Sequence, residues 1–279
     1  MNLYLLLHWI DNFLQIKIFS KTWIPDKNRK AVLIIVHGLA EHIGRYNHLG
    51  EFLSSKGYIV EGYDMRGHGR SEGKTAYIKS IYDHVDDLKK FVNIIEKKHR
   101  EKKIFIIGHS LGGAVTCLYL IDNKPKISGV ILSGAVIKIS DEISPTLQKL
   151  SLLVGIFFPF LKTTKINSNA ISRDKNIVIL YNNDNLVYKG GTYARTGAEI
   201  IRGTKIIKKR MKHIITPILI MHGSSDRLTD PSGSYLLYHG ISSKDKTLKI
   251  YEEFYHELFN EIGKEKVFKD IDSWLEKRL

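Results

Sequence analysis

The sequence predicts an α/β fold in which a mostly parallel central sheet is flanked by helices and carries an inserted helical cap. Short runs of β-branched and other apolar residues have the pattern of strands covered on both faces. Stretches with helical apolar spacing separate these runs, and strands that alternate with helices imply a parallel sheet with right-handed crossovers. The alternation stops between residues 136 and 211, which predicts the cap.

The first part of the chain supplies most of the expected sheet. Residues 1–10 are apolar but too few to span a bilayer, and no Lys or Arg precedes them as in a signal peptide. We expect them to form a terminal strand on the sheet, with contact to a membrane surface as the alternative. The elements expected next are an edge strand at 13–19, buried strands at 31–36, 58–63 and 104–107, a short helix closed by Gly57, and a helix at 81–100.

The second part divides into a cap and a return to the sheet. A buried strand at 127–133 precedes the break, and the strongly apolar stretch 147–161 is too short for a transmembrane helix. Polar turns, including one at 181–184, and a helix with a basic end follow. Strands at 217–221 and 248–251 and a closing helix at 268–279 restore the α/β pattern. We therefore expect one domain, with core segments 1–135 and 212–279 and a cap at 136–211.

Composition indicates an ordinary globular protein with an unusual charge. The 279 residues include 43 Lys and Arg against 29 Asp and Glu, a formal net charge of +14. The basic residues are dispersed and no nucleic-acid motif accompanies them, which favours a solvated surface over nucleic-acid binding. Attraction to an anionic membrane stays open. The single cysteine, Cys117, excludes an intrachain disulfide, and we expect a buried thiol in a cytoplasmic protein, with peripheral membrane contact as the alternative.

The most informative motif is the Gly-x-Ser-x-Gly sequence at 108–112. An apolar strand ends at Gly108 and a helix begins within a residue or two of Ser110, so the turn between them is very tight. Such a turn holds the serine at the tip of the strand in a strained conformation, and a Cβ at Gly108 or Gly112 would collide with a neighbouring element. Ser110 is therefore the candidate nucleophile; the alternative is a serine that only caps a helix.

A serine hydroxyl needs a base, and the base needs an orienting carboxylate. In this fold the acid and then the histidine follow the serine, each in a loop after a strand. Asp226 and His256 occupy these places, with Asp230 as a nearby competitor that we expect to cap a helix instead. For the other histidines near the motifs we expect supporting roles: His109 points away from the nucleophile, whereas His37 and His68 bond to the backbone.

A tetrahedral intermediate requires two backbone donors, one from the residue after the nucleophile and one from the loop after an early strand. The amides of Leu111 and Leu39 are the candidates. The sequence shows no metal-ligand cluster, and Gly67-His68-Gly69 is too short to cradle phosphates. We therefore expect neither a metal nor a cofactor.

Five segments together resemble the monoacylglycerol lipase and lysophospholipase branch of the α/β-hydrolases. They are His37-Gly38-Leu39-Ala40-Glu41-His42-Ile43-Gly44-Arg45-Tyr46, Gly108-His109-Ser110-Leu111-Gly112-Gly113, Ser172-Arg173-Asp174, Tyr181-Asn182-Asn183-Asp184 and His222-Gly223-Ser224-Ser225-Asp226-Arg227-Leu228. The resemblance implies an apolar acyl tunnel under the cap. It also implies that Glu41 and Arg45 help to build the polar end of the site and that Tyr181 faces it. A structural ion pair is the alternative for Glu41 and Arg45, and Leu39-Ala40 departs from the small residues usual there.

These observations predict a serine hydrolase that cleaves the ester of a single-chain lipid, a monoacylglycerol or a lysophospholipid, through an acyl-enzyme. We expect the apolar stretch 147–161 to line the acyl pocket and touch the membrane, or else only to bury the cap against the core. The alternatives for the whole protein are a carboxylesterase or thioesterase, an acyltransferase, and a non-catalytic binding protein on the same scaffold. A carboxylate nucleophile, as in epoxide hydrolases and dehalogenases of this fold, is disfavoured by Ser110.

Overall fold

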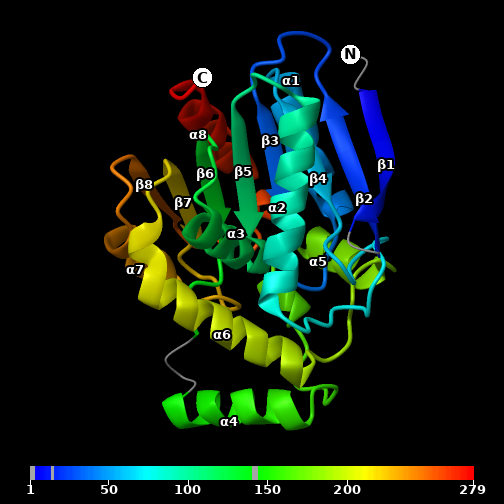
Figure 1. Cartoon of the computed structure of the whole chain (residues 1–279), viewed down its shortest axis with the longest axis vertical. Coiled ribbons are helices and arrows are strands. Elements are labelled where there is room, and N and C mark those ends of the chain that lie inside the picture. Colours follow the sequence, from blue (N-terminus) through cyan, green and yellow to red (C-terminus); the bar gives the residue numbers. More distant parts are fainter. Residues whose placement is uncertain (1–3, 14–15, 140–143) are drawn as a thin grey trace.

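An eight-stranded sheet forms the centre of the molecule. The computed structural model describes residues 4–13, 16–139 and 144–279. The strand order is β1-β2-β4-β3-β5-β6-β7-β8 (Figure 1). Strands β3 to β8 run parallel to one another, β2 runs antiparallel to β4, and β1 runs antiparallel to β2. The strands are β1 (Tyr4–Phe13), β2 (Ile16–Ile24), β3 (Val32–Val36), β4 (Ile59–Tyr63), β5 (Ile104–His109), β6 (Gly129–Ser133), β7 (Ile218–Gly223) and β8 (Lys246–Tyr251). The predicted α/β fold with a mostly parallel sheet is confirmed.

The N-terminal edge differs in part from the prediction. The apolar N-terminal segment does form a strand, because Tyr4–Phe13 pairs with β2. The edge strand expected at 13–19 is wrong: Ile16–Ile24 lies between β1 and β4, and residues 14 and 15 lie outside the described residues. Trp23 of β2 is fully buried. The alternation of apolar and polar residues at 13–19 indicates one exposed face, but it could not reveal that β1 pairs with the outer edge of β2.

Helices cover both faces of the sheet and divide the core into two clusters. The helices are α1 (Asn47–Ser55), α2 (Ile81–Lys98), α3 (Leu111–Asn123), α4 (Pro145–Phe157), α5 (Lys175–Asn183), α6 (Ala194–Arg210), α7 (Ser232–Gly240) and α8 (Lys264–Glu276). Alternate residues of β3 point to opposite faces, so that Ile34 packs with α2, α3 and α7, whereas Ile35 packs with α1 and α8. This two-sided burial explains the continuous apolar pattern of the strands.

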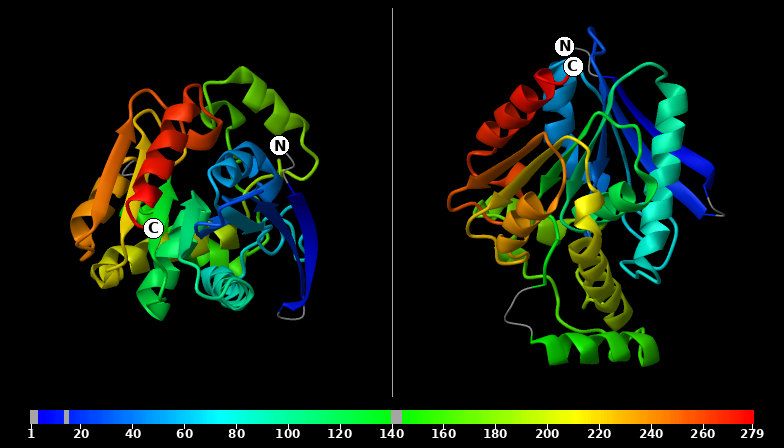
Figure 2. Two further views of the ribbon diagram at one scale, coloured as in Figure 1. Left: turned by 90° about the horizontal axis from the view of Figure 1, so that it is seen from above. Right: turned by 60° about the vertical axis from the view of Figure 1, so that its left-hand side comes forward.

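The segment from 136 to 211 contributes α4, α5 and α6 beyond the carboxyl ends of the parallel strands, and α4 is the outermost element (Figures 1 and 2). Helix α4 rests on α6 through Gly155, where an added Cβ would lie 2.4 Å from Cβ of Ala198. The polar turn expected at 181–184 is wrong in part, since Tyr181 to Asn183 form the last turn of α5. None of the helices in the described ranges is long and apolar enough to cross a membrane.

Candidate active site

The tight turn predicted between strand and helix is present. β5 ends at His109, Ser110 follows with φ 52° and ψ −117°, and α3 begins at Leu111. A Cβ on Gly112 would lie 2.2 Å from the carbonyl oxygen of Val36, and one on Gly108 would lie 2.9 Å from Cα of Gly113. No side chain fits at either distance, so glycine is required at both positions. The turn thereby places Ser110 at the carboxyl end of β5, where it lines a cavity.

Ser110, His256 and Asp226 form a hydrogen-bonded chain. Nε2 of His256 lies 2.9 Å from Oγ of Ser110, and Nδ1 of the same ring lies 2.7 Å from Oδ2 of Asp226. Asp226 follows β7 and His256 follows β8, so the three residues meet although they are far apart in the chain. The structure therefore brings together the three residues that chain order selected, with the geometry of a serine nucleophile, a base and an orienting acid.

Asp226 has further partners that the sequence did not indicate. Its Oδ1 accepts hydrogen bonds from the amides of Leu228 and Thr229, at 2.8 and 3.0 Å. Its Oδ2 lies 2.7 Å from the Thr229 hydroxyl and 3.0 Å from Nε2 of His222. His222 is part of the His222–Leu228 segment that resembles the family. Its contact with Asp226, and that of Thr229, became apparent only from the distances in the folded structure.

The electrostatics of the pair favour a charged His256. Burial alone would lower the pKa of His256, but the adjacent charge and hydrogen bond of Asp226 raise it above its ordinary value. Burial opposes ionisation of Asp226 as well, yet the charge of His256 and hydrogen bonds from both histidines hold the pKa of Asp226 well below its ordinary value. The site is thus arranged to stabilise the imidazolium that forms when a base accepts a proton.

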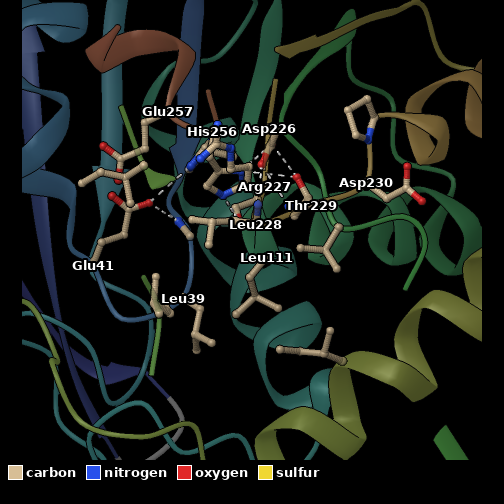
Figure 3. Close-up of a pocket in the computed structure, with 18 of the residues that line it drawn as sticks. Leu39, Glu41, Leu111, Asp226, Arg227, Leu228, Thr229, Asp230, His256 and Glu257 are labelled. Atoms are coloured by element: carbon tan, nitrogen blue, oxygen red, sulfur yellow. Dashed lines mark hydrogen bonds and ion pairs between the residues drawn. The ribbon is translucent and has the colours of Figure 1, made fainter. Parts of the chain in front are cut away.

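The competing residues have supporting roles. Oδ1 of Asp230 accepts from the amide of Ser232 at 2.8 Å, at the start of α7, and Figure 3 shows Asp230 on the far side of Thr229 from His256. His37 lies 2.8 Å from the carbonyl oxygen of Gly38. The ring centroid of His109 lies 4.8 Å from that of His256, and Nδ1 of His109 lies 3.0 Å from the carbonyl oxygen of Ser133. That His109 points away from the nucleophile stays a prediction.

A cavity of about 690 Å³ opens at Ser110 (Figure 3). Its lining includes the apolar residues Leu39 and Leu111, and its walls also include Glu41 and Tyr181. Further apolar walls come from five isoleucine and valine residues of the 136–200 segment: Val136, Ile139, Ile166, Ile171 and Ile200. The lining contains no residue of the stretch 147–161, so the expectation that this stretch lines the pocket is wrong within the described residues.

Glu41, which lines the cavity, forms an ion pair with Arg45, which was one of the two roles expected for these residues. Nη1 of Arg45 donates to Oε2 of Glu41 at 2.9 Å, and Arg45 lies over the ring of Tyr181 at 4.8 Å. The sequence did not indicate Glu257, which receives both Nη1 and Nη2 of Arg45 at 2.6 and 2.7 Å. Arg45 itself is not part of the cavity lining.

Fold and site together define a serine hydrolase of the α/β-hydrolase superfamily. Residues 27–263 match the Hydrolase_4 family, described as serine aminopeptidase S33, and the chain belongs to this family.

Two relatives and one solved structure show where in this family the chain lies. It is 34% identical over 265 residues to the monoglyceride lipase of Rattus norvegicus, covering 94% of this chain and 88% of the relative. It is 32% identical over 260 residues to the monoacylglycerol lipase of Mycolicibacterium smegmatis, covering 93% of each. A soluble variant of monoglyceride lipase from Saccharomyces cerevisiae, solved with a substrate analog, superposes with a TM-score of 0.86 at 26% identity, covering 100% of this chain and 96% of that one. The predicted resemblance and the predicted class of ester hydrolase are confirmed.

Within the described ranges, no group of three or more His, Cys, Asp or Glu residues has an arrangement that could hold a metal ion. Cys117 is buried in the core, and burial raises the pKa of its thiol to about 12.

Proposed function

We propose that the protein hydrolyses the ester of a single-chain lipid, with a monoacylglycerol as its substrate. The observation that carries this proposal is the Ser110–His256–Asp226 chain at the mouth of a largely apolar cavity. Relatives named as monoacylglycerol lipases over most of this chain support the choice of substrate. A lysophospholipid is the nearest alternative, because it also presents one acyl chain.

The proposed reaction uses an acyl-enzyme. Oγ of Ser110 attacks the ester carbonyl carbon while Nε2 of His256 accepts its proton. The tetrahedral intermediate collapses, the imidazolium returns the proton to the departing glycerol oxygen, and the acyl group stays on Ser110. Water, deprotonated by His256, then attacks the acyl-enzyme, and the fatty acid leaves as the proton returns to Ser110. Asp226 holds the tautomer that makes Nε2 the basic nitrogen.

We propose the amides of Leu39 and Leu111 as the donors to the oxyanion. Leu111 is the first residue of α3, where helix amides lack intrahelical partners. The loop that carries Leu39 lies against the nucleophile, since a Cβ on Gly38 would lie 3.1 Å from Cβ of Ser110. Two amides at these places suit the charge that develops on the carbonyl oxygen.

The acyl chain occupies the apolar part of the cavity in this proposal, under a cap formed by residues 136–211. Glu41 and Tyr181 line the wall that receives the glycerol end, and Arg45 supports both from behind. Leu39 narrows this end more than a small residue would. A thioesterase, an acyltransferase or a short-chain carboxylesterase could use the same three residues, but a cavity of about 690 Å³ with apolar walls favours a lipid acyl chain.

We propose that α4 and the residues after it contact the lipid surface. Eight large apolar side chains of this stretch are between 49 and 72% exposed: Leu147, Leu150, Leu153, Ile156, Phe157, Phe158, Phe160 and Leu161. Only Gly155 of α4 is buried, so the alternative that this stretch serves to bury the cap against the core is not supported. Eight exposed apolar side chains within one short stretch of a strongly basic protein suit an anionic membrane.

The test is hydrolysis by the wild type and by Ser110→Ala. Each protein is incubated with a series of monoacylglycerols and lysophospholipids of matched acyl chains, and the released fatty acid is measured. The wild type should favour long-chain monoacylglycerols, and the variant should lose at least about a thousandfold in rate. Substantial residual activity in Ser110→Ala would contradict the mechanism, whereas a preference for lysophospholipids would change only the substrate.

A further inference from the structure

A buried ion cluster connects the two loops on which the proposed chemistry depends. The amide of Gly38, in the loop of the proposed oxyanion donor, donates to Oε1 of Glu41 at 2.6 Å. Oε2 of Glu41 accepts a hydrogen bond from Nη1 of Arg45. Nη1 and Nη2 of Arg45 also donate to the two carboxylate oxygens of Glu257. Glu257 is the residue directly after His256. Three side chains thus span the space between the oxyanion loop and the loop of the base.

Each carboxylate oxygen of Glu41 and Glu257 accepts at least one hydrogen bond from a protein donor. Oε1 of Glu41 also accepts from the hydroxyl of Tyr46 at 2.8 Å, and Oε2 of Glu257 accepts from Nδ2 of Asn260 at 2.9 Å. Glu41 and Glu257 are 4 and 5% exposed. A contact that serves only to recognise a ligand would leave at least one of these oxygens without a protein donor. Their arrangement is that of a rigid connection, because a planar guanidinium fixes both carboxylates in direction as well as distance.

We propose that Glu41, Arg45 and Glu257 act as a clamp that fixes the His256 loop against the Gly38–Leu39 loop, which makes them positioning residues for the reaction. This inference rests on the proposed role of Ser110, His256 and Leu39. The base and the oxyanion donor must both be placed within a fraction of an ångström of the reacting ester, although they come from opposite ends of the chain. The clamp is the short polar path that joins their loops.

The cluster also bears on the charge of His256. Although burial opposes ionisation, Arg45 holds the pKa of Glu257 below its ordinary value, so that Glu257 carries a negative charge beside the loop of the base, in addition to Asp226. Burial raises the pKa of Glu41. The other groups near the His256 ring are Thr229, Ser110 and His109, and burial lowers the pKa of His109 to about 3, so that it stays neutral. Removing the charge of Glu257 should therefore destabilise the imidazolium and lower the pKa of His256.

The experiment compares Glu257→Gln and Arg45→Lys with the wild type on two substrates of equal acyl chain, a monoacylglycerol and a p-nitrophenyl ester. Glu257→Gln keeps the shape but removes the charge, and Arg45→Lys keeps the charge but removes the fork. Glu253→Gln is the matched control, because the Glu253 side chain is 77% exposed and its carboxylate pairs with Arg173, at 3.5 Å, away from the cluster. Thermal unfolding of each protein verifies that it is folded.

We expect kcat to fall about 10- to 100-fold on both substrates, with KM within about threefold, because misplacement of catalytic groups lowers kcat to this extent. The acid limb of kcat/KM should move to lower pH in Glu257→Gln, which a purely structural role would not cause. If Arg45→Lys does not fold, Asn260→Ala takes its place and should lower kcat by a smaller factor on both substrates. A rise in KM for the monoacylglycerol alone, or wild-type kcat in Glu257→Gln, would overturn the clamp.

A fluorophosphonate probe separates this inference from the proposed function. The probe reacts with a serine nucleophile whatever the natural substrate is. If the wild type cleaves no lipid ester, the assignment as a lipase fails, yet slower labelling of Glu257→Gln than of Glu253→Gln would still support the clamp. Equal labelling rates in the two variants would contradict the clamp even where the lipase activity is confirmed.

Discussion

The hydroxyl of Thr229 lies 2.7 Å from Oδ2 of Asp226, the same carboxylate oxygen that faces His256. Thr229→Val removes this hydrogen bond at nearly constant volume. Since a hydrogen bond to a buried charge contributes about 1.5–3 kcal/mol, we expect kcat/KM to fall at least about tenfold and the free energy of unfolding to drop by about 1–3 kcal/mol. Ester hydrolysis and denaturant unfolding measure the two effects.

The control for this substitution is Thr75→Val, at an exposed position, which should change stability by less than about 0.5 kcal/mol. Wild-type activity in Thr229→Val would show that the two backbone amides suffice to hold Asp226.

The activity should depend on pH through His256. Its neutral form is the base, and its pKa is raised above the ordinary value of about 6.5 because the charge of Asp226 outweighs burial. We therefore expect kcat/KM to fall as the pH drops through this raised pKa, at a midpoint above about 6.5. Initial rates on a neutral ester between pH 5 and 9 provide the profile, and a midpoint well below 6.5 would contradict the assignment.

The contribution of Asp226 to stability also declines as the pH falls, but in a lower pH range than the activity. Its pKa in the folded protein lies below its unfolded value of about 3.9, so its contribution is present above that value and is lost as the pH falls further. The difference in unfolding free energy between the wild type and Asp226→Asn should accordingly shrink below about pH 4. An unchanged difference down to pH 2 would be inconsistent with this.

Two glycines offer a matched test of the packing at the turn. Gly112→Ala places a Cβ 2.2 Å from the carbonyl oxygen of Val36, whereas Gly197→Ala meets no atom within 4 Å. We expect Gly112→Ala to destabilise the protein by about 1–3 kcal/mol or more. Gly197→Ala, inside α6, should stabilise it by about 0.5–1 kcal/mol. Thermal unfolding distinguishes the two, and equal effects would contradict the account of the turn.

The exposed surface of α4 predicts binding to vesicles. Leu150 and Phe157 are 54 and 72% exposed, and each would lose about 1–2 kcal/mol of transfer free energy on replacement by serine. The double variant Leu150→Ser and Phe157→Ser should therefore bind vesicles containing phosphatidylglycerol at least about tenfold more weakly, as measured by co-sedimentation. Ile215→Ser, at a 66% exposed residue outside α4, is the control. Equal loss in the control would show that general hydrophobicity drives the binding.

The sequence was sufficient for the parts of the site that local patterns determine. Ser110 is bounded by glycines at a strand end, and Asp226 and His256 each follow a late strand, so motif and chain order selected them. Glu257 could not be found in this way, because its partner Arg45 is 212 residues away and an isolated glutamate carries no pattern.

The errors have physical reasons of the same kind. The apolar stretch 147–161 has the composition of a buried segment, but composition cannot show that α4 stands outside the core with one buried residue. Residues Tyr181 to Asn183 resemble a turn because they are polar, yet Asp174 caps the start of α5 and the helix extends through them. In both cases the local composition did not determine whether the segment is buried or helical.

Ser110 lies in a backbone conformation that glycine adopts freely and other residues adopt at a cost of about 1–3 kcal/mol. Selection for catalysis and selection for stability therefore act in opposite directions at this one position. A lineage that no longer needed the hydrolase activity would gain stability by replacing the serine with glycine. A serine in a turn that disfavours it is therefore consistent with the proposed use of its hydroxyl in the reaction.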